Sequence, residues 1–231
     1  PILATSRASS EFTAEFTIKG DAAGDLKEQT ADNYEVGMRA EFFNKRITID
    51  LAGYLIKMQD EFVSYNPGGG APSVTNNAGE SESRGLEVGL GLKPLDWVSL
   101  NIAYSYAVHE YERYRVSQTV NYNGKDKPSA PRHNSNIRLD VKPPFLPGSD
   151  IELERIYRGE YWLNDANTAE YNGHTLWNLR ASYNWKDVTV WVHCLNLLDE
   201  QYAFSASKSG SDPASYTAGD PKTIFGGLTY K

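Results

Sequence analysis

The feature that most constrains the fold of this chain is a long two-residue alternation of apolar and polar side chains. Between residues 98 and 108 every even position is Val, Leu, Ile or Tyr, and every odd position is Ser, Asn or Ala. Residues 34–42 and 85–92 alternate in the same way. Successive side chains of a strand point to opposite faces, so these stretches predict a sheet with one apolar and one polar face. Their length approaches the roughly 9–11 residues of a tilted transmembrane strand, whereas ordinary strands average about 5–6.

The connections between these stretches alternate between short and long. Short connections are expected at 44–45, 94–96, 143–149 and 186–187, and long ones at 65–79, 109–130, 163–173 and 199–220. An outer-membrane barrel has short periplasmic turns and longer extracellular loops. The pattern therefore predicts an all-β, antiparallel transmembrane meander of about nine or ten strands. The first of them is expected to end at Phe12–Ile18, where the alternation is already visible.

Composition narrows the class further. The mean hydropathy is −0.54, and no apolar run approaches the roughly 20 residues of a membrane-spanning helix. Fifteen Tyr and 5 Trp residues suit the aromatic girdles of a barrel. The net charge is −7 and no basic stripe is present, which argues against nucleic acid as a partner. The single cysteine, Cys194, lies in an apolar strand pattern and is expected to be a buried thiol.

Four segments carry a resemblance to a known family. Asp25–Gly37 contains the D-L-K and N-Y-E-V-G elements that introduce a late barrel strand of TonB-dependent outer-membrane receptors, with Gln29 departing from the usual Pro-Glu. Asn77–Glu87 resembles the family's N-x-G-x-x-x-x-x-G-x-E strand, and Asn196–Tyr202 resembles its N-L-F-D-x-x-Y signature. Gly219–Tyr230 resembles the G-x-P-R…G…Y final strand. The four segments follow one another in the family's order.

The resemblance implies a fold, a place and a function. Residues 1–231 would be the C-terminal part of a 22-stranded barrel, without the family's plug domain, and an aromatic residue is expected to follow Lys231. The protein would span the outer membrane of a Gram-negative bacterium many times, surrounded by lipid and lipopolysaccharide. It would bind and import a ferric siderophore or related metal chelate, powered through TonB, which contacts the missing N-terminal region. It would not be an enzyme, and no resident cofactor or metal is implied.

The long loops and the strand ends beside them hold the ligand-binding candidates. Arg offers planar, charge-assisted donors to an anionic chelate, and Tyr and Trp offer rigid amphipathic contact. Two segments, 109–115 and 155–162, mix these residue types, and the loop Glu110–Lys127 is expected to contribute to ligand capture. The candidates are Tyr111, Arg113, Tyr114, Arg115, Tyr157, Arg158, Tyr161 and Trp162.

A second group of polar residues is expected to line the inside of the barrel. Charged residues recur at the polar positions of the alternating stretches, where they would face the lumen. They are Glu35, Arg39, Glu41, Asp50, Glu87, Arg138, Asp140 and Arg180. The resemblance implies that such a lining packs against the plug.

The sequence leaves other functions open. His109 and His174 lie near expected loops and could ligate a haem iron in a haem or other nutrient receptor of the same family. A ten-stranded omptin-type protease would pair one of these histidines with Glu110 or Asp165. A soluble lipocalin-like barrel also alternates, but the loop asymmetry and the placing of Trp177 and Trp185 at opposite ends of one apolar face favour lipid outside. No His, Cys or Asp cluster has the spacing of a metal site.

Overall fold

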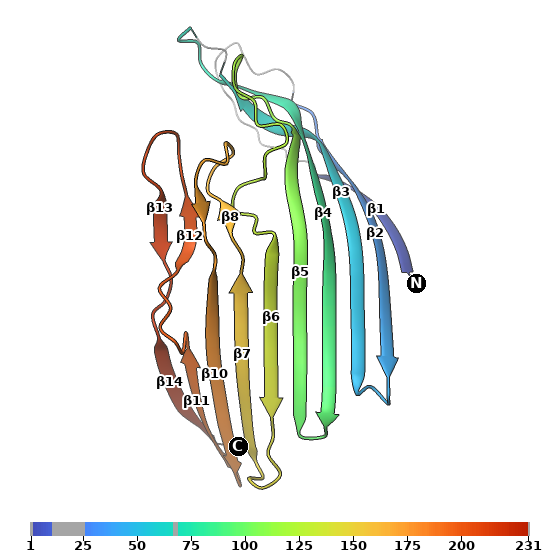
Figure 1. The fold of residues 1–231 in the computed structure, drawn as a ribbon, viewed down its shortest axis with the longest axis vertical. Coiled ribbons are helices and arrows are strands. Elements are labelled where there is room, and N and C mark those ends of the chain that lie inside the picture. The colour runs from blue at the N-terminus through green and yellow to red at the C-terminus, as the bar shows by residue number, and fades with distance from the viewer. Residues whose placement is uncertain (1, 11–25, 67–68, 231) are drawn as a thin grey trace.

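A computed structural model describes residues 2–10, 26–66 and 69–230, with residues 2–10 described by their backbone alone. Most of the chain forms one ten-stranded sheet in which neighbouring strands are antiparallel (Figure 1). Its strands, in spatial order, are β1 (Ile2–Ser10), β2 (Gln29–Phe42), β3 (Ile47–Tyr65), β4 (Val74–Leu95), β5 (Val98–Arg113), β6 (His133–Val141), β7 (Ser149–Arg158), β10 (His174–Trp185), β11 (Val188–Leu195) and β14 (Thr223–Tyr230). The expected meander is confirmed. The expected strand at Phe12–Ile18 lies outside the described residues.

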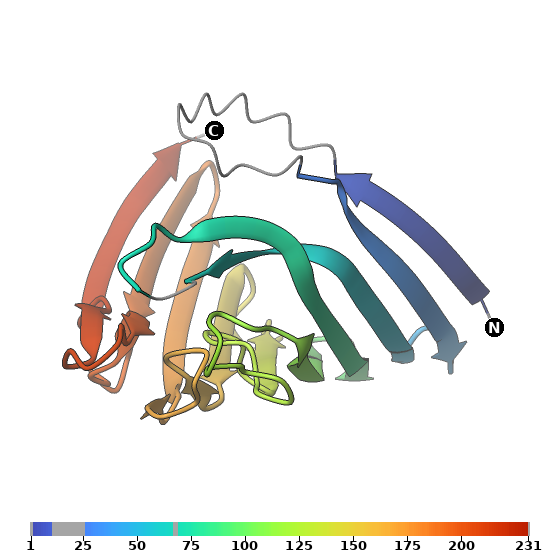
Figure 2. The ribbon, with the colours of Figure 1, turned by 90° about the horizontal axis from the view of Figure 1, so that it is seen from above.

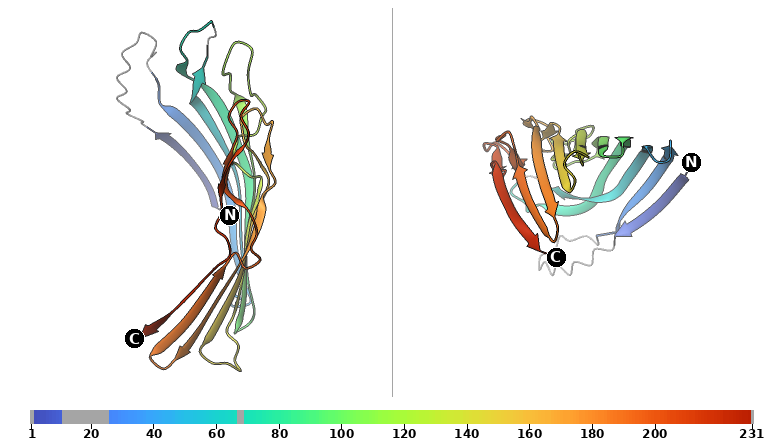
Figure 3. Two further views of the ribbon diagram at one scale, coloured as in Figure 1. Left: turned by 90° about the vertical axis from the view of Figure 1, so that its left-hand side faces the viewer. Right: turned by 90° about the horizontal axis from the view of Figure 1, so that it is seen from below.

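The sheet is strongly curved, so its two faces differ in shape as well as in chemistry. Seen from above it forms an open arc with β1 and β14 at its two ends (Figure 2), and the views from the side and from below show the same trough (Figure 3). The polar positions of successive strands together line a broad hollow of about 770 Å³, to which Glu35, Asp50, Glu87 and Asn136 all contribute. The polar face is therefore the concave face, and the apolar face is convex.

The convex face is apolar and exposed. Val36 is 54% exposed, Leu86 is 46% exposed and Val192 is 44% exposed, although all three lie in the middle of long strands. Aromatic residues stand near both ends of this face, with Tyr104 and Tyr106 toward the long loops and Trp185 and Tyr230 toward the short turns. Soluble monomers rarely expose contiguous apolar surfaces of this extent, so this face is suited to an apolar environment. No helix in the described ranges is long and apolar enough to cross a membrane.

The short connections close one end of the sheet. They are 43–46, 96–97, 142–148 and 186–187, close to the expected positions. Residues Phe43, Asn44 and Lys45 all have positive φ, as does Lys186. Tight hairpin turns require such left-handed backbone because it matches the twist of the flanking strands.

The opposite end is more structured than the sequence predicts. β4 and β5 have 22 and 16 residues and extend into the expected loops 65–79 and 109–130, whereas β3, with 19 residues, ends at Tyr65, where its loop is expected to begin. Two long connections contain hairpins of their own, β8 (Tyr161–Trp162) with β9 (Glu170–Tyr171) and β12 (Ala203–Ser207) with β13 (Ser215–Ala218). Local alternation did not reveal these hairpins because their strands are too short to show a period.

The glycine of the expected R-G-L-E segment has a packing role. Gly85 on β4 is paired with Tyr54 on β3, and a Cβ at Gly85 would lie 2.6 Å from atoms of the Tyr54 ring. The Tyr54 ring therefore lies directly over the glycine, and any larger residue would displace it. This close approach explains why the strand carries a glycine at that position.

Candidate functional site

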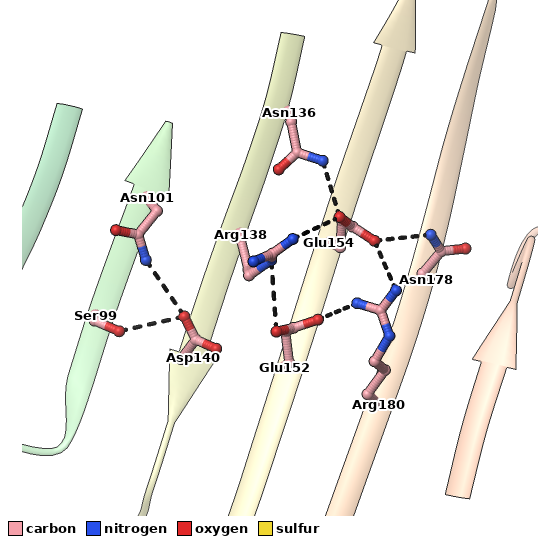
Figure 4. Close-up of polar contacts among 9 residues, drawn as sticks. All are labelled: Ser99, Asn101, Asn136, Arg138, Asp140, Glu152, Glu154, Asn178 and Arg180. Atoms are coloured by element: carbon pink, nitrogen blue, oxygen red, sulfur yellow. Dashed lines mark hydrogen bonds and ion pairs between the residues drawn. The ribbon is translucent and has the colours of Figure 1, made fainter. Parts of the chain in front are cut away.

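The centre of the concave face is a polar network across β6, β7 and β10. Glu154 is only 4% exposed and accepts four hydrogen bonds (Figure 4). Its Oε1 accepts from Asn136 Nδ2 at 2.9 Å and Arg138 Nη2 at 3.1 Å. Its Oε2 accepts from Asn178 Nδ2 at 3.0 Å and Arg180 Nη2 at 3.1 Å. Because every strand contributes alternate residues to one face, these five side chains reach one another across three strands.

A second carboxylate extends the network toward the short turns. Glu152 lies 3.5 Å from Arg138 Nε and also pairs with Arg180 Nη1. On the neighbouring strand pair, Asp140 accepts from Ser99 at 3.3 Å and from Asn101 at 3.5 Å (Figure 4). The structure thus confirms the inward direction of the charged residues expected to line the lumen. Glu35, Arg39, Asp50 and Glu87 line the broad hollow, Glu41 and Arg138 line a second hollow beside it, and Asp140 and Arg180 lie in the networks just described.

The network continues into the resemblance motif Asn196–Tyr202. Asn178 Oδ1 accepts a hydrogen bond from the backbone N–H of Asn196 at 3.0 Å. Asn196 is buried, has φ of 49°, and its side chain bonds the carbonyl oxygens of Glu200 at 2.9 Å and Asp220 at 3.1 Å. Asn tolerates left-handed backbone and can bond neighbouring backbone groups, so this residue type suits the end of β11. Asn196 therefore ties the loop after β11 to the segment that enters β14.

Two of the resemblance motifs, Asn196–Tyr202 and Gly219–Tyr230, also contact each other. The ring of Tyr202 covers Gly219, where a Cβ would lie 2.2 Å from the Tyr202 Cζ atom. The backbone N–H of Gly219 donates to the Tyr202 carbonyl at 2.9 Å, and the Asp220 N–H donates to the Tyr202 hydroxyl at 3.3 Å. The N-L-L-D-E-Q-Y and G-D-P-K segments are thus two halves of one structural unit at the loop end of the last strands.

The long loops pack together at the loop end of the sheet, and we call loops 114–132, 159–173 and 196–222 the loop cap. Asp126 connects the first two loops, because its N–H donates to Asn167 Oδ1 and its carbonyl accepts from Asn167 Nδ2, both at 2.9 Å. Arg132 binds both oxygens of the Asp126 carboxylate at 2.9 Å. The Ser129 N–H donates to the Trp162 carbonyl at 2.9 Å. The two loops are therefore held in a fixed relation.

A half-buried lysine anchors the first loop to the long strands. Lys127 Nζ lies 2.7 Å from Glu61 Oε1 and 2.8 Å from Ser81 Oγ, and 5.5 Å from the centre of the Tyr111 ring. Tyr111 in turn donates to Asp165 Oδ1 at 2.7 Å. This chain of contacts joins β3, β4 and β5 to the two loops.

The third loop joins through apolar packing. Tyr161, Leu163, Ala203 and Ala206 form a buried cluster between the two hairpins of the loop cap. The Lys208 N–H donates to the Leu163 carbonyl at 3.0 Å. Burial raises the pKa of the Tyr161 phenol, which keeps the ring neutral inside this cluster.

The structure places the candidates from 111–115 in different environments. Tyr111 is 6% exposed and stacks on Tyr114 with ring centres 4.2 Å apart. Burial also raises the pKa of the Tyr114 phenol. Arg113 pairs with Glu80 and donates to the Ala78 carbonyl at 3.2 Å. Arg115 is exposed beside the tip of the loop, and no carboxylate of the described residues pairs with it.

The candidates from 157–162 lie on different faces of the sheet. Arg158 lines the concave hollow, with its Cζ atom 4.7 Å from the centre of the Tyr161 ring and no carboxylate partner among the described residues. Tyr157 follows the convex face, where Arg155 Cζ lies 5.4 Å from its ring centre. Tyr161 is 3% exposed, and Trp162 lines a small hollow beside Asp126 and Arg132. Arg158 is thus the candidate cation that both faces the hollow and lacks a negative partner.

The histidines have ordinary hydrogen-bond partners. His109 Nδ1 lies 2.8 Å from Ser83 Oγ, and His174 Nδ1 lies 3.0 Å from the Tyr171 hydroxyl. The carboxylates proposed to pair with them in a protease bond elsewhere, since Glu110 binds Arg84 and Asp165 accepts from Tyr111. In the part of the chain that the structure describes, no group of three or more His, Cys, Asp or Glu is arranged to hold a metal ion.

The sequence interpretation missed the residues that organise the loop cap. Asp126, Lys127 and Asn167 have no motif, and they are 40 or more positions from some of their partners along the chain. A sequence signal does exist at Asn196, whose N-L-L-D context matches the family signature. The remainder required the fold, because only the antiparallel meander brings the loops of alternate hairpins to the same end.

The family comparison agrees with this architecture. Residues 7–197 match the profile of the TonB dependent receptor-like beta-barrel. The chain belongs to this family. The likeness covers most of the sheet, and it confirms both the all-β fold and the assignment of the sheet to part of a receptor barrel.

Solved structures of TonB-dependent receptors share the fold. The siderophore receptor PiuA from Acinetobacter baumannii is 21% identical, with a TM-score of 0.75 over 88% of this chain and 28% of its own. The ferric yersiniabactin uptake receptor FyuA from Yersinia pestis is 16% identical, with a TM-score of 0.73 over 98% and 33%. The ferric-catecholate import receptor Fiu from Escherichia coli K12 is 15% identical, with a TM-score of 0.76 over 98% and 32%. The chain thus spans about a third of each receptor's length. No curated protein matches its sequence.

Proposed function

We propose that this chain is the C-terminal part of the barrel of an outer-membrane receptor that binds a ferric siderophore or related metal chelate. Import would be powered through TonB, which would contact a region of the receptor outside residues 1–231. The observation that carries the proposal is the polar concave wall, where Arg158 faces the hollow and contacts Tyr161 and Phe204 of the loop cap. The family consists of receptors, and the proposal assigns no catalytic step to this chain.

Arg158 suits an anionic chelate for physical reasons. Its guanidinium lies against the Tyr161 ring and bonds the Phe204 carbonyl at 3.5 Å, so its position is set by the loop cap. It has no carboxylate partner among the described residues, and a guanidinium binds carboxylate or catecholate oxygens with charge-assisted hydrogen bonds. The neighbouring His174 and Asn134 add further polar groups to the same hollow. Tyr114, Arg115 and Trp162 would contact the chelate from the loop cap.

The test measures uptake by the full-length receptor in cells. A panel of ⁵⁵Fe-labelled chelates, comprising catecholate, hydroxamate and citrate complexes together with haem, would be offered to a strain without other iron receptors. We expect one ferric chelate to be taken up, and uptake to stop in a strain that lacks TonB. Arg158→Gln should raise the half-saturating concentration about tenfold, because a charge-assisted hydrogen bond contributes about 1.5–3 kcal/mol. Uptake of haem alone, or TonB-independent uptake, would contradict the proposal.

The matched control is Arg46→Gln at the opposite end of the sheet. Arg46 also bonds backbone carbonyls, at 3.0 Å for Lys93, but it lies beside a short turn and pairs with Asp96. We expect this variant to leave the half-saturating concentration unchanged. Equal effects of the two substitutions, at equal surface levels, would show that Arg158 has no specific role in ligand binding.

A further inference from the structure

The cations on the convex face include Lys57, Arg84 and Arg155, and Arg155 is different from the other two. Lys57 lies 3.8 Å from a Glu82 carboxylate oxygen. Arg84 pairs with Glu82 at 2.8 Å and with Glu110 at 2.9 Å. Arg155 has no carboxylate partner in the described part of the chain. Unlike Lys57 and Arg84, it is therefore a positive charge that no carboxylate of the described residues compensates.

The direction of Arg155 follows from the strand register. Arg155 alternates with Glu154, which points to the concave wall, and its Nη1 donates to Ser135 Oγ on the neighbouring strand at 3.4 Å. Its Cζ lies 5.4 Å from the centre of the Tyr157 ring. Both contacts lie on the loop side of Arg155, so the guanidinium is directed toward the loop end of the convex face, as a snorkelling side chain would be.

Arg155 lies where the convex face changes from aliphatic to polar and aromatic residues. On the turn side its neighbours are aliphatic, with Leu139 and Leu153 facing each other across β6 and β7. On the loop side they are Ser135 and His133, and His133 Nδ1 lies 2.8 Å from the Tyr104 hydroxyl. A band of aromatic and polar residues at this height is where a barrel meets the lipid headgroups. A buried arginine at the bilayer midplane would cost about 2–4 kcal/mol, whereas the cost falls to about 0–1 kcal/mol near the interface.

We propose that Arg155, Ser135 and His133 form a site for the phosphate group of a lipid in the leaflet at the loop end of the barrel. The guanidinium supplies bidentate charge-assisted donors, the serine supplies a hydroxyl, and the free ring nitrogen of His133 supplies a further polar group. Phosphate is the anion that matches this donor set and that headgroups place at this height. The lipid's acyl chains would lie along the aliphatic surface below. The inference rests on the outer-membrane placement in the proposed function, but not on the chelate.

Native mass spectrometry of the full-length receptor in detergent would test the site. The probe is bisphosphorylated lipid A, compared with the same lipid after removal of its phosphates. We expect the bisphosphorylated lipid to bind about tenfold more tightly, and Arg155→Gln to remove that difference. Arg84→Gln is the matched control, because Arg84 shares the convex face but is neutralised by two glutamates. It should retain the difference.

Two further measurements keep the outcome decisive. Inorganic phosphate at the concentration of the lipid should not displace it, because the acyl chains contribute to binding. Displacement would instead indicate an unspecific anion site and overturn the proposal. Equal lipid binding by the Arg155→Gln variant would overturn it as well.

Arg155→Gln removes an outward charge and should assemble normally, and ⁵⁵Fe-chelate uptake by the same variant should be unchanged. A receptor that binds the lipid but imports no chelate would contradict the proposed function and leave this site intact.

Discussion

The substitution Glu154→Gln tests whether the concave wall is held together by its buried carboxylate. All four hydrogen bonds of Glu154 come from donors, two on each oxygen. Glutamine has nearly the same shape, but one of its two terminal atoms is an NH₂ group that can only donate. Whichever way the amide is turned, that group faces one arginine and one asparagine that also donate. The substitution therefore replaces two attractive contacts with two unfavourable ones while leaving the volume unchanged.

The expected loss follows from those contacts. One charged hydrogen bond contributes about 1.5–3 kcal/mol and one neutral bond about 1 kcal/mol. Removing one partner of a buried ion pair costs about 3–5 kcal/mol in other proteins. Because Arg138 and Arg180 keep Glu152 as a partner, the loss should lie at or below the lower end of that range. We expect Glu154→Gln to lower the free energy of unfolding of the full-length receptor by about 2–4 kcal/mol.

The control is Asp50→Asn on the same concave face. Asp50 accepts from Arg39 Nε at 2.8 Å, but the two side chains are 50% and 76% exposed. An exposed pair contributes about 0–1 kcal/mol, so this variant should differ little from the wild type. The assay is reversible urea unfolding in lipid vesicles, followed by tryptophan fluorescence and by the heat-dependent shift of the folded barrel in gels.

A second variant tests the geometry itself. Asn178→Asp in the Glu154→Gln background would return an acceptor to the Oε2 side of the network, where Asn178 now donates at 3.0 Å. We expect the double variant to recover at least half of the lost stability. Equal losses for Glu154→Gln and Asp50→Asn, or no coupling between positions 154 and 178, would refute the reasoning.

Three further predictions concern the convex face, the loop cap and the motif at the end of β11. Leu100→Arg places a charge on the convex face and should lower the stability of the folded barrel by about 2–4 kcal/mol, whereas Asn101→Arg on the concave face should not. Equal heat stability and equal surface levels of the two variants would contradict the assignment of faces. Replacing the loop tip 116–120 by two glycines should weaken chelate binding at unchanged surface level, and wild-type affinity in an equilibrium binding assay would exclude the tip. Asn196→Ala should lower the unfolding midpoint in the same urea assay by an amount equivalent to about 1–3 kcal/mol, since it leaves the carbonyls of Glu200 and Asp220 without their donor; an unchanged midpoint would show that the loop after β11 does not depend on it.

The candidate ligand residues show how far local patterns reach. Segments 109–115 and 155–162 were selected for their mixture of Arg and aromatic residues, and the structure does bring both to the loop end of the sheet. Composition could not separate Arg113, which is paired with Glu80, from Arg158, which has no carboxylate partner among the described residues. The pairing of a charge depends on the strand beside it, and that neighbour is fixed by the register of the whole sheet.

The alternation of faces is interrupted within β3, and the sequence pattern does not show where. Lys57 and Glu61 are both at odd positions of β3, yet Lys57 pairs with Glu82 on the convex face and Glu61 binds Lys127 beside Ser81. An irregularity in the pairing between Met58 and Glu61, with Asp60 at φ of 56°, exchanges the two faces. A bulge inserts a residue without a partner and reverses the parity beyond it.

The sequence by itself determined the class of the fold, the separation into one apolar and one polar face, and the end at which the loops gather. These properties follow from a period of two residues and from the positions of turns, and both are local. Only the tertiary structure decided which residues touch: Glu154 with Asn178, Asp126 with Asn167, and Arg155 with Ser135. Such contacts join segments far apart in the chain, and they depend on register, bulges and loop packing, in which a shift of one residue moves a side chain to the opposite face.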